Sequence, residues 1–326
     1  MPKVYLDEIE AVTARALVRH GARDEVAGLV AHAVRTAEAN GNNICGLSYV
    51  ESYCRQLTTG RIDGRVEPAV TVERPGAVQV DGRLGFAQPA FAAGFHTAVE
   101  AARSNGVCGY AVAHTHTSTS LGYFTEQFTE MGLLAIGAAN ASPRLAPPGG
   151  SVPVLGANPI AMAVPDGRGG VAFQFDFSTS VVAVERIAMA QAAGESIPLG
   201  WAVDGNGEPT TDPAAALDGS LLWAGDHKGY GLGLLVELLA SALTGSRLSA
   251  DVPPLKSPYG PPHDLGQFYL VIDPSAFSGR LFYSHLEELT ASIAEQEGAR
   301  LPGTGRVNPY FVKVDDDLWA TIVGLA

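Results

Sequence analysis

The pattern of apolar and polar positions predicts helices at the start of the chain and short strands after them. Between residues 5 and 40, apolar side chains recur at roughly helical spacing on both sides of the break "RHGARDE", which predicts a pair of helices. A further helix is predicted over "YVESYCRQLTTGRIDG", with Gly60 as its C-terminal glycine. The next stretch, "AVTVERPGAVQVDGRLG", alternates apolar and polar residues around Pro-Gly and Asp-Gly turn signals and therefore predicts short antiparallel strands.

Helical and strand patterns alternate through the rest of the chain, which is typical of an α/β fold. The predicted helices are "AFAAGFHTAVEAARSNG", "GYFTEQFTEMG", residues 181 to 193, the core helix "GLGLLVELLASALTG" and "YSHLEELTASIAEQEG". The predicted strands are "VCGYAVAHTH", "LLAIGAANA", "PIAMAV", "GVAFQFDF", "GQFYLVIDP" and "YFVKV". The proline-rich "ADVPPLKSPYGPPHD" predicts a surface connection or a lid, and "ARLPGTGRV" a second loop.

The charge of the chain restricts its partners. Its 34 acidic residues against 21 basic ones, with no cluster of Lys or Arg, would repel a phosphate backbone, so we expect no nucleic-acid partner. Its three cysteines lack CxxC spacing, which favours reduced thiols in the cytoplasm. The N-terminus "MPKVYLDEIE" does not resemble an export signal, and the longest apolar segment is short for a membrane span and contains Glu237. We therefore expect a cytoplasmic protein with no membrane partner.

Two segments contain residues suited to binding a ligand. In "GDHKGYGLG", Lys228 stands at a predicted helix start beside Gly229, where free backbone N–H groups and a cation together favour a phosphate, although such a lysine is often plain surface. In "FDFSTS", Asp176, Ser178 and Thr179 are suited either to capping the next helix or to holding the polar edge of a ligand. A GxGxxG motif between a first strand and helix is missing, so a standard Rossmann unit is not expected.

Taken together and in order, five segments resemble the type-2 malate/L-lactate dehydrogenase family, which also contains sulfolactate, ureidoglycolate, diketogulonate and piperideine-2-carboxylate oxidoreductases. The segments are "PPGGSVPVLGANPIAMAVP", "FDFSTS", "IPLGWAVDGNGEPTTDP", "HKGYGLGLLVELLASALTG" and "RLPG". The resemblance implies an enzyme that uses NADH or NADPH and acts on a small molecule. It also implies a non-Rossmann α/β fold, with a mostly antiparallel sheet wrapped by helices, and a homodimer with the active site near the subunit interface.

The resemblance also assigns roles to segments and residues. Residues 1–72 with 265–326 would form a helical substrate and dimerisation region, and residues 73–264 a cofactor-binding domain. The residues that would line or close over the cofactor are Asp176, Ser178, Thr179, Lys228, Gly229, Pro302, Gly303 and Thr304, with Asn140 as a further candidate.

The catalytic segments depart from the family, which makes the chain a divergent member. Family members carry Ser-His-Gly followed three residues later by Arg, whereas "ICGLSY" places Cys45 at the histidine and Tyr49 at the arginine. They also carry Asn-Ser-Asn-His before a Gly-Tyr pair, whereas here the four residues run from His114 to Thr117. Thr117 thus stands where the second catalytic histidine is expected. Ordinary malate or lactate turnover is therefore not expected.

The replacements leave several roles open. Residues two apart on a strand face the same side, so His114 and His116 would share a pocket wall, with His116 as a displaced proton donor, or both would be structural. A metal site is not expected, because no third ligand flanks them. Tyr49 would donate a proton or pack, and Cys45 lacks a neighbour that lowers its pKa, so lining of the pocket is favoured for both. His263, in the proline-rich loop, is a candidate substrate contact.

The function expected from the sequence is transfer of hydride to an atypical ketone or cyclic imine, in a specialised biosynthetic pathway. A protonated imine needs less help from an acid than a ketone does, which would tolerate the loss of the histidines. The alternative is a redox-neutral cyclase, lyase or isomerase on the same scaffold, with the nicotinamide cofactor retained but not consumed, or absent.

Overall fold

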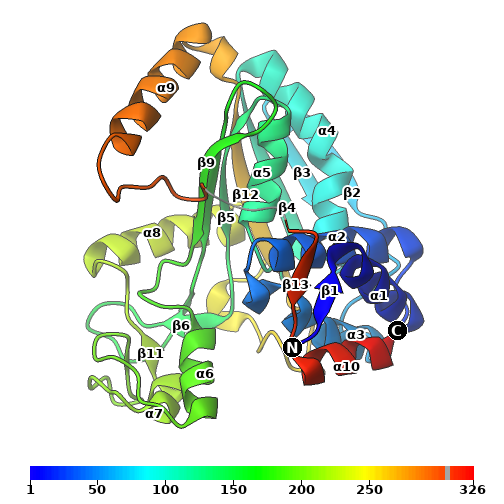
Figure 1. Ribbon diagram of the computed structural model, residues 1–326, viewed down its shortest axis with the longest axis vertical. Helices are drawn as coiled ribbons and strands as arrows, with labels where there is room; N and C mark the ends of the chain where they lie inside the picture. Colours follow the sequence, from blue (N-terminus) through cyan, green and yellow to red (C-terminus); the bar gives the residue numbers. More distant parts are fainter. Residues whose placement is uncertain (305–308) are drawn as a thin grey trace.

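A seven-stranded sheet forms the centre of the molecule, and Figure 1 shows helices packed along it. The computed structural model describes residues 1–304 and 309–326. The strands of this sheet, in spatial order, are β2 (Ala69–Arg74), β3 (Ala77–Asp81), β4 (Val107–Thr115), β12 (Leu265–Ile272), β5 (Leu134–Ala139), β8 (Ile160–Pro165) and β9 (Val171–Phe177). Within it only β3 and β4 pair in parallel. The predicted non-Rossmann α/β fold with a mostly antiparallel sheet is thus confirmed.

Two helices cover one face of this sheet and bury its aromatic core. They are α4 (Ala87–Asn105) and α5 (Gly122–Glu130). α4 ends at Gly106, whose left-handed φ of +79° is typical of a glycine at a helix C-terminus. Phe91 packs against the rings of Phe124 and Tyr269 at centroid distances of 4.9 and 5.2 Å. Full burial of each such ring contributes roughly 1.5–3 kcal/mol, so this cluster fixes α4 and α5 on the strands.

The two ends of the chain meet in a helical region beside the sheet. Its elements are β1 (Lys3–Tyr5), α1 (Leu6–Arg19), α2 (Asp24–Ala39), the 3-10 turns Asn43–Cys45 and Leu47–Tyr49, α3 (Val50–Thr58), β13 (Phe311–Lys313) and α10 (Asp316–Leu325). β1 pairs antiparallel with β13, and both termini lie in this region (Figure 1). The predicted helical pair is confirmed, and so is the end of α3, since Gly60 has a φ of +73°.

A second, smaller sheet extends from the lower end of β9. Its strands are β10 (Ala202–Val203), β11 (Ser220–Leu221), β6 (Pro143–Leu145) and β7 (Leu155–Gly156), and the helices beside it are α6 (Val184–Ala193) and α7 (Pro213–Asp218). Its core includes Ile187 and Trp223, and the Trp223 indole donates to the Ala146 carbonyl at 2.8 Å. This unit therefore has its own small core.

The apolar segment from Gly231 to Gly245 was predicted to be a core helix. The prediction is wrong for one face of this helix, which is exposed. α8 (His227–Glu237) continues as a π-helical turn, Leu238–Ala242, whose Ala240 packs with Val236 against Ala138. Leu238 and Leu243, however, are 62% and 59% exposed. Among the described residues, no helix is long and apolar enough to cross a bilayer.

Helix α9 (Arg280–Ala294), which follows the 3-10 turn Pro274–Ala276, projects beyond the sheet in Figure 1 and contains no buried residue. Its Leu281 and Leu289 are 60% and 53% exposed. An apolar side chain gains little from folding in such a position, and exposed apolar side chains that lie together are typical of a contact surface. A further 3-10 turn, Ser249–Asp251, precedes the proline-rich loop.

The late strand β12 lies between β4 and β5 in the middle of the large sheet. The segment 265–326 is therefore divided in space, because β12 joins the sheet whereas β13 and α10 lie with the N-terminal helices. The division of the chain into residues 1–72 with 265–326 and residues 73–264 stays a prediction.

Candidate active site

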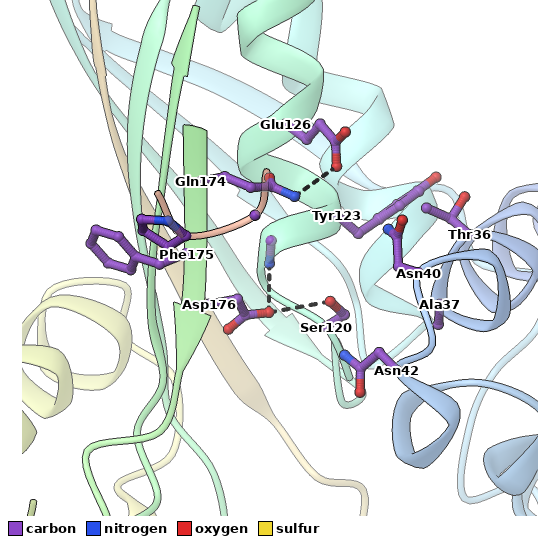
Figure 2. A pocket seen from close by; sticks show the side chains of 13 residues that line it. Thr36, Ala37, Asn40, Asn42, Ser120, Tyr123, Glu126, Gln174, Phe175 and Asp176 are labelled. Atoms are coloured by element: carbon purple, nitrogen blue, oxygen red, sulfur yellow. Dashed lines mark hydrogen bonds between the residues drawn. The ribbon is translucent and has the colours of Figure 1, made fainter. Parts of the chain in front are cut away.

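A cleft of about 280 Å³ opens between the end of α2, the start of α5 and strand β9 (Figure 2). It brings together segments that are far apart in the sequence. Its lining consists of Thr36, Ala37, Asn40, Asn42, Ser120, Gly122, Tyr123, Glu126, Gln174, Phe175, Asp176, Pro302 and Gly303. Three of the predicted cofactor residues, Asp176, Pro302 and Gly303, thus lie in one cleft.

Asp176 fixes the N-terminus of α5 at the floor of this cleft. Its Oδ2 accepts from the Gly122 backbone N–H at 2.8 Å and from the Ser120 hydroxyl at 3.2 Å (Figure 2). A carboxylate at a helix N-terminus also interacts favourably with the helix dipole. Gly122 allows this approach, because a Cβ there would lie 3.2 Å from the Cβ of Asp176.

The turn that contains Pro302 and Gly303 rests on β9 beside Asp176. The Gln174 N–H donates to the Pro302 carbonyl at 3.2 Å. Gly303 has a φ of +73°, and a Cβ there would lie 2.6 Å from the Gln174 carbonyl oxygen. The Thr304 hydroxyl bonds to the Leu301 carbonyl at 2.7 Å and so closes the turn on itself. The rest of the "RLPGTGR" motif, from Gly305, lies outside the described residues.

The end of β9 also contacts the start of α8, which contains Lys228. Thr179 is buried, its N–H and hydroxyl both donate to the Ala157 carbonyl, and its own carbonyl accepts from Ala224. A Cβ on Gly229 would lie 2.4 Å from the Ala224 carbonyl oxygen, so only glycine allows this packing. The hydrogen bonds of Thr179 therefore hold the backbone that precedes α8 close to its first turn. Lys228, in that turn, stays exposed.

The capping interpretation of the "FDFSTS" hydroxyls is wrong. The next helix, α6, begins after Ala183, and no side chain caps it. The Ser180 hydroxyl donates instead to the Val182 carbonyl at 2.8 Å and shares a hydrogen bond with the Ser178 hydroxyl at 2.8 Å. These hydroxyls stabilise the bend after β9, and α6 starts too late in the chain for them to reach it.

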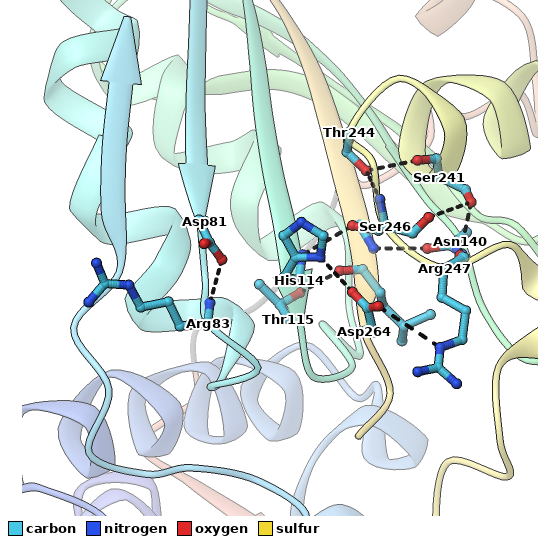
Figure 3. A network of polar contacts seen from close by, with 12 residues as sticks. Asp81, Arg83, His114, Thr115, Asn140, Ser241, Thr244, Ser246, Arg247 and Asp264 are labelled. Atoms are coloured by element: carbon cyan, nitrogen blue, oxygen red, sulfur yellow. Dashed lines mark hydrogen bonds and ion pairs between the residues drawn. The ribbon is translucent and has the colours of Figure 1, made fainter. Parts of the chain in front are cut away.

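Asn140 joins the end of β5 to two later segments (Figure 3). Its Nδ2 donates to the Arg247 carbonyl at 2.8 Å, and its Oδ1 accepts from the Gly266 N–H at 2.9 Å. Both the nitrogen and the oxygen of this buried amide therefore have hydrogen-bond partners within the protein. A contact between Asn140 and the cofactor stays a prediction, and its position outside the cleft lining does not favour it.

His114 and His116 do not share a wall, so the strand-based expectation is wrong. His114 has a left-handed φ of +55°, and the pairing of β4 with β12 shifts register beside it. This breaks the two-residue alternation. The His114 ring bonds to the Asp264 carboxylate at 2.7 Å (Figure 3), is partly exposed, and is not among the residues that line the cleft. Within the described parts of the chain, no cluster of three or more ligating side chains is suited to a metal ion.

His116 is 2% exposed and packs inside the protein. Its Nε2 contacts the Gln56 side-chain oxygen at 3.1 Å, and its ring stacks on His263 at a centroid distance of 3.9 Å. Burial, the His263 ring and the nearby Arg61 guanidinium hold the pKa of His116 well below its usual range. Burial and Arg61 also lower the pKa of His263 to about 3. Neither ring lines the cleft, so the donor role of His116 and the substrate contact of His263 stay predictions.

Cys45 and Tyr49 are held as neutral groups, and neither they nor Thr117 are among the residues that line the cleft. Burial, followed by the charge of Asp176, raises the pKa of the Cys45 thiol to about 12, so this cysteine is not a thiolate near neutral pH. Burial likewise raises the pKa of Tyr49, which is 7% exposed. The Thr117 hydroxyl is buried and accepts from the Thr119 N–H at 3.4 Å. The lining role favoured for Cys45 and Tyr49 therefore stays a prediction.

Sequence reasoning missed several residues of the cleft. The Gln174 amide donates to the Glu126 carboxylate at 3.2 Å across the cleft (Figure 2), and Asn42 contacts Cys45 through its side chain. Asn42 stands three residues before Cys45 in the sequence, which was an available signal. Tyr123 was used only to align the Gly-Tyr pair, although it also lines the cleft.

Comparison with known proteins gives one consistent result. The model of the malate/L-lactate dehydrogenase family matches residues 4–310. A (2R)-3-sulfolactate dehydrogenase (NADP(+)) from Chromohalobacter salexigens is 39% identical over 93% of this chain and 90% of that protein. A delta(1)-pyrroline-2-carboxylate/delta(1)-piperideine-2-carboxylate reductase from Pseudomonas putida is 36% identical over 98% and 94%.

The solved structures agree. The crystal structure of delta1-piperideine-2-carboxylate reductase from Pseudomonas syringae pvar. tomato superposes with a TM-score of 0.92 and 33% identity over 100% of both chains. Together with the mostly antiparallel sheet, these matches identify the chain as a member of the malate/L-lactate dehydrogenase family, a family of oxidoreductases.

Proposed function

We propose that the protein is an NAD(P)H-dependent oxidoreductase that transfers hydride to the carbon of a ketone or of a cyclic imine. The observation that carries the proposal is the meeting of β9, the turn at Pro302 and the start of α5 in one cleft, within a chain of this family. The similar proteins named above include an NADP(+)-dependent dehydrogenase and a cyclic imine reductase, which supports both the cofactor and the substrate classes.

The start of α8 fits the phosphates of such a cofactor. The Asp226 side chain at the N-cap does not cap the helix, and the Lys228 N–H donates to the Gly225 carbonyl at 3.1 Å, which leaves the N–H groups of His227 and Gly229 for an anion. Lys228 is exposed in the same turn, and Gly229 holds that turn against Thr179. When bound, a reduced nicotinamide supplies the hydride. Lys228 would hold the phosphates, and the turn at Pro302 and Gly303 would cover the ring end.

The groups beside the cleft favour an imine over a ketone. Reduction of a ketone needs a proton donor for the oxygen, and burial makes both Cys45 and Tyr49 weaker acids than usual. A cyclic imine is protonated at nitrogen before the hydride arrives, so no further proton is needed in the step. The Asp176 carboxylate, at the floor of the cleft, would stabilise the iminium charge. We place this activity in a specialised biosynthetic pathway of the cytoplasm.

We further propose that the protein is a homodimer. The exposed apolar side chains of the α8 end and of α9, among them Leu238, Leu243 and Leu289, need cover, and a second copy of the chain would supply it. Analytical ultracentrifugation at micromolar concentration tests this. A monomer at all concentrations would contradict it.

The test of the function is a fluorescence titration with NADPH and with NADH, followed by a substrate screen at 340 nm. The screen contains pyrroline-2-carboxylate, piperideine-2-carboxylate and 3-sulfopyruvate. Lys228→Ala should weaken cofactor binding, whereas Lys313→Ala, which removes an exposed lysine of β13, should not. No binding of any nicotinamide form would refute the proposal. Turnover in which the bound cofactor keeps its redox state would establish the redox-neutral alternative instead.

A further inference from the structure

We propose that the side-chain oxygen of Gln174 accepts a hydrogen bond from the ring N–H of the substrate and thereby selects a protonated imine over a ketone. The inference rests on the proposed function and names a residue that sets the specificity of the same cleft. Gln174 lines this cleft and stands two residues before Asp176 on β9. Because side chains two apart on a strand point to the same face, both polar groups belong to one wall of the cleft.

The backbone and the stem of Gln174 are held by the turn that contains Pro302 and Gly303. The Gln174 N–H donates to the Pro302 carbonyl at 3.2 Å. A Cβ on Gly303 would lie 2.8 Å from the Cγ of Gln174, so the turn packs directly on this side chain. Gln174 is only 3% exposed, and close packing on all sides leaves its side chain little freedom to change rotamer.

Glu126 determines which way the amide of Gln174 is turned. The amide nitrogen, Nε2, donates to the Glu126 carboxylate at 3.2 Å, as Figure 2 shows. A carboxylate offers only acceptors, so the nitrogen must face it and the oxygen must point elsewhere. Among residues 1–304 and 309–326, this oxygen, Oε1, has no hydrogen-bond partner. The amide is thus fixed with an acceptor that the described protein groups do not use.

Such an acceptor in the wall of the cleft favours a ligand that carries an N–H group. A buried amide oxygen destabilises the protein until a donor reaches it, so satisfying it would contribute to binding. A protonated cyclic imine has its N–H on the atom bonded to the reacting carbon. A ketone has an oxygen there, which is also an acceptor and would repel Oε1. One hydrogen bond would therefore discriminate between the two classes and orient the reacting carbon.

Gln174 and Asp176 would have different tasks in this arrangement. The Asp176 carboxylate holds the start of α5 and supplies negative charge at the floor of the cleft, which favours any cation nearby. The attraction between charges depends little on direction, whereas a hydrogen bond to an amide oxygen requires a donor that points at it. Gln174 thus adds a preference for an N–H group that the charge of Asp176 does not provide.

The test compares two planar probes of the same shape, pyrrole-2-carboxylate, whose ring contains an N–H, and furan-2-carboxylate, whose ring contains an oxygen in its place. Their binding to the full-length protein saturated with NADPH is measured by calorimetry. The wild-type protein should bind the pyrrole about tenfold more tightly than the furan. Gln174→Met, which keeps the length of the side chain and removes the acceptor, should weaken the pyrrole about tenfold and change the furan little.

Gln191→Met is the matched control, since Gln191 is exposed on α6 and is not among the residues that line the cleft. It should leave both affinities unchanged. The proposal is overturned if the wild-type protein does not prefer the pyrrole, a result that needs no variant to fold. It is also overturned if Gln174→Met weakens both probes equally or neither.

The carboxamide of the nicotinamide also carries an N–H, so a second measurement separates the two sources of this donor. The affinities for NADPH and for its reduced 3-acetylpyridine analogue, which lacks that N–H, are compared in the wild-type protein and in Gln174→Met. The variant should leave their ratio unchanged. A ratio that falls while the preference for the pyrrole persists would assign the contact to the cofactor and overturn the proposal. Absence of NADPH binding to the wild-type protein would refute the proposed function and is recognised separately.

Discussion

The buried pair His116 and His263 should make the fold sensitive to acid, and His263→Phe should remove part of that sensitivity. His263 is 1% exposed, and neither of its ring nitrogens has a well-formed hydrogen bond among the described residues. The groups near it are the stacked His116 ring and the guanidinium groups of Arg61 and Arg247. The Leu255 backbone favours a charged ring, but burial and Arg61 outweigh it. Phenylalanine keeps the stacking and removes the proton-binding site.

The magnitude follows from the pKa difference. In the folded protein the pKa of His263 is about 3, against 6.5 in the unfolded chain, so between these values the unfolded state binds the extra proton. Stability is therefore lost as pH falls from about 6.5 toward 3. At pH 5 the loss from His263 alone is about 2 kcal/mol, at 1.36 kcal/mol per unit. His116 changes the stability in the same direction, since its pKa is also lowered.

The assay is urea unfolding at pH 7 and at pH 5, at one protein concentration, followed by circular dichroism. The wild-type protein should lose about 2 kcal/mol more between the two pH values than His263→Phe does. His285→Gln, which changes an exposed histidine of α9, should behave as wild type. Equal pH dependence in the wild-type protein and His263→Phe would show that His263 is not buried as a neutral base.

Three further substitutions test other parts of the structure. Lys228→Ala should raise the Kd for NADPH about tenfold in the fluorescence titration, since it removes one charge-assisted phosphate contact. Unchanged affinity would place the phosphates elsewhere. Gly303→Ala should lower the Tm and the NADPH affinity together, because its Cβ would lie 2.6 Å from the Gln174 carbonyl oxygen, and an unaltered Tm would contradict that packing. Glu237→Ala should lower the free energy of unfolding, measured in urea, by about 3–5 kcal/mol, because this buried carboxylate accepts from the N–H and hydroxyl of Ser249. A loss below about 1 kcal/mol would refute this structural role.

Local signals predicted most of the elements. Gly60 and Gly106 end their helices with positive φ, because glycine alone adopts this conformation without strain. The β2–β3 hairpin follows from short-range alternation, and the central strands follow from short apolar runs. The joint position of Asp176, Pro302 and Gly303 was accessible only through the resemblance, since no local pattern places residues so far apart in one cleft.

The failures have physical reasons. Strand alternation could not place His114, because its left-handed backbone and the register shift beside it depend on the pairing with β12. The amphipathic character of the α8 end was hidden, since a helix that is apolar all round carries no sign of which face is buried. The wall of the cleft at Asn40 and Asn42 was missed because helix ends rich in asparagine usually indicate a turn alone.

The position of β12 between β4 and β5 has a consequence for synthesis on the ribosome. Both neighbours leave the exit tunnel long before β12 does, on the order of ten seconds at about 5–20 residues per second. During this interval each presents an unpaired edge, and apolar strands with free edges associate readily with other chains. The nascent chain should therefore be most prone to aggregation just before β12 emerges. A fragment that stops short of Leu265 should require a chaperone to stay in solution, although it contains most of the sheet.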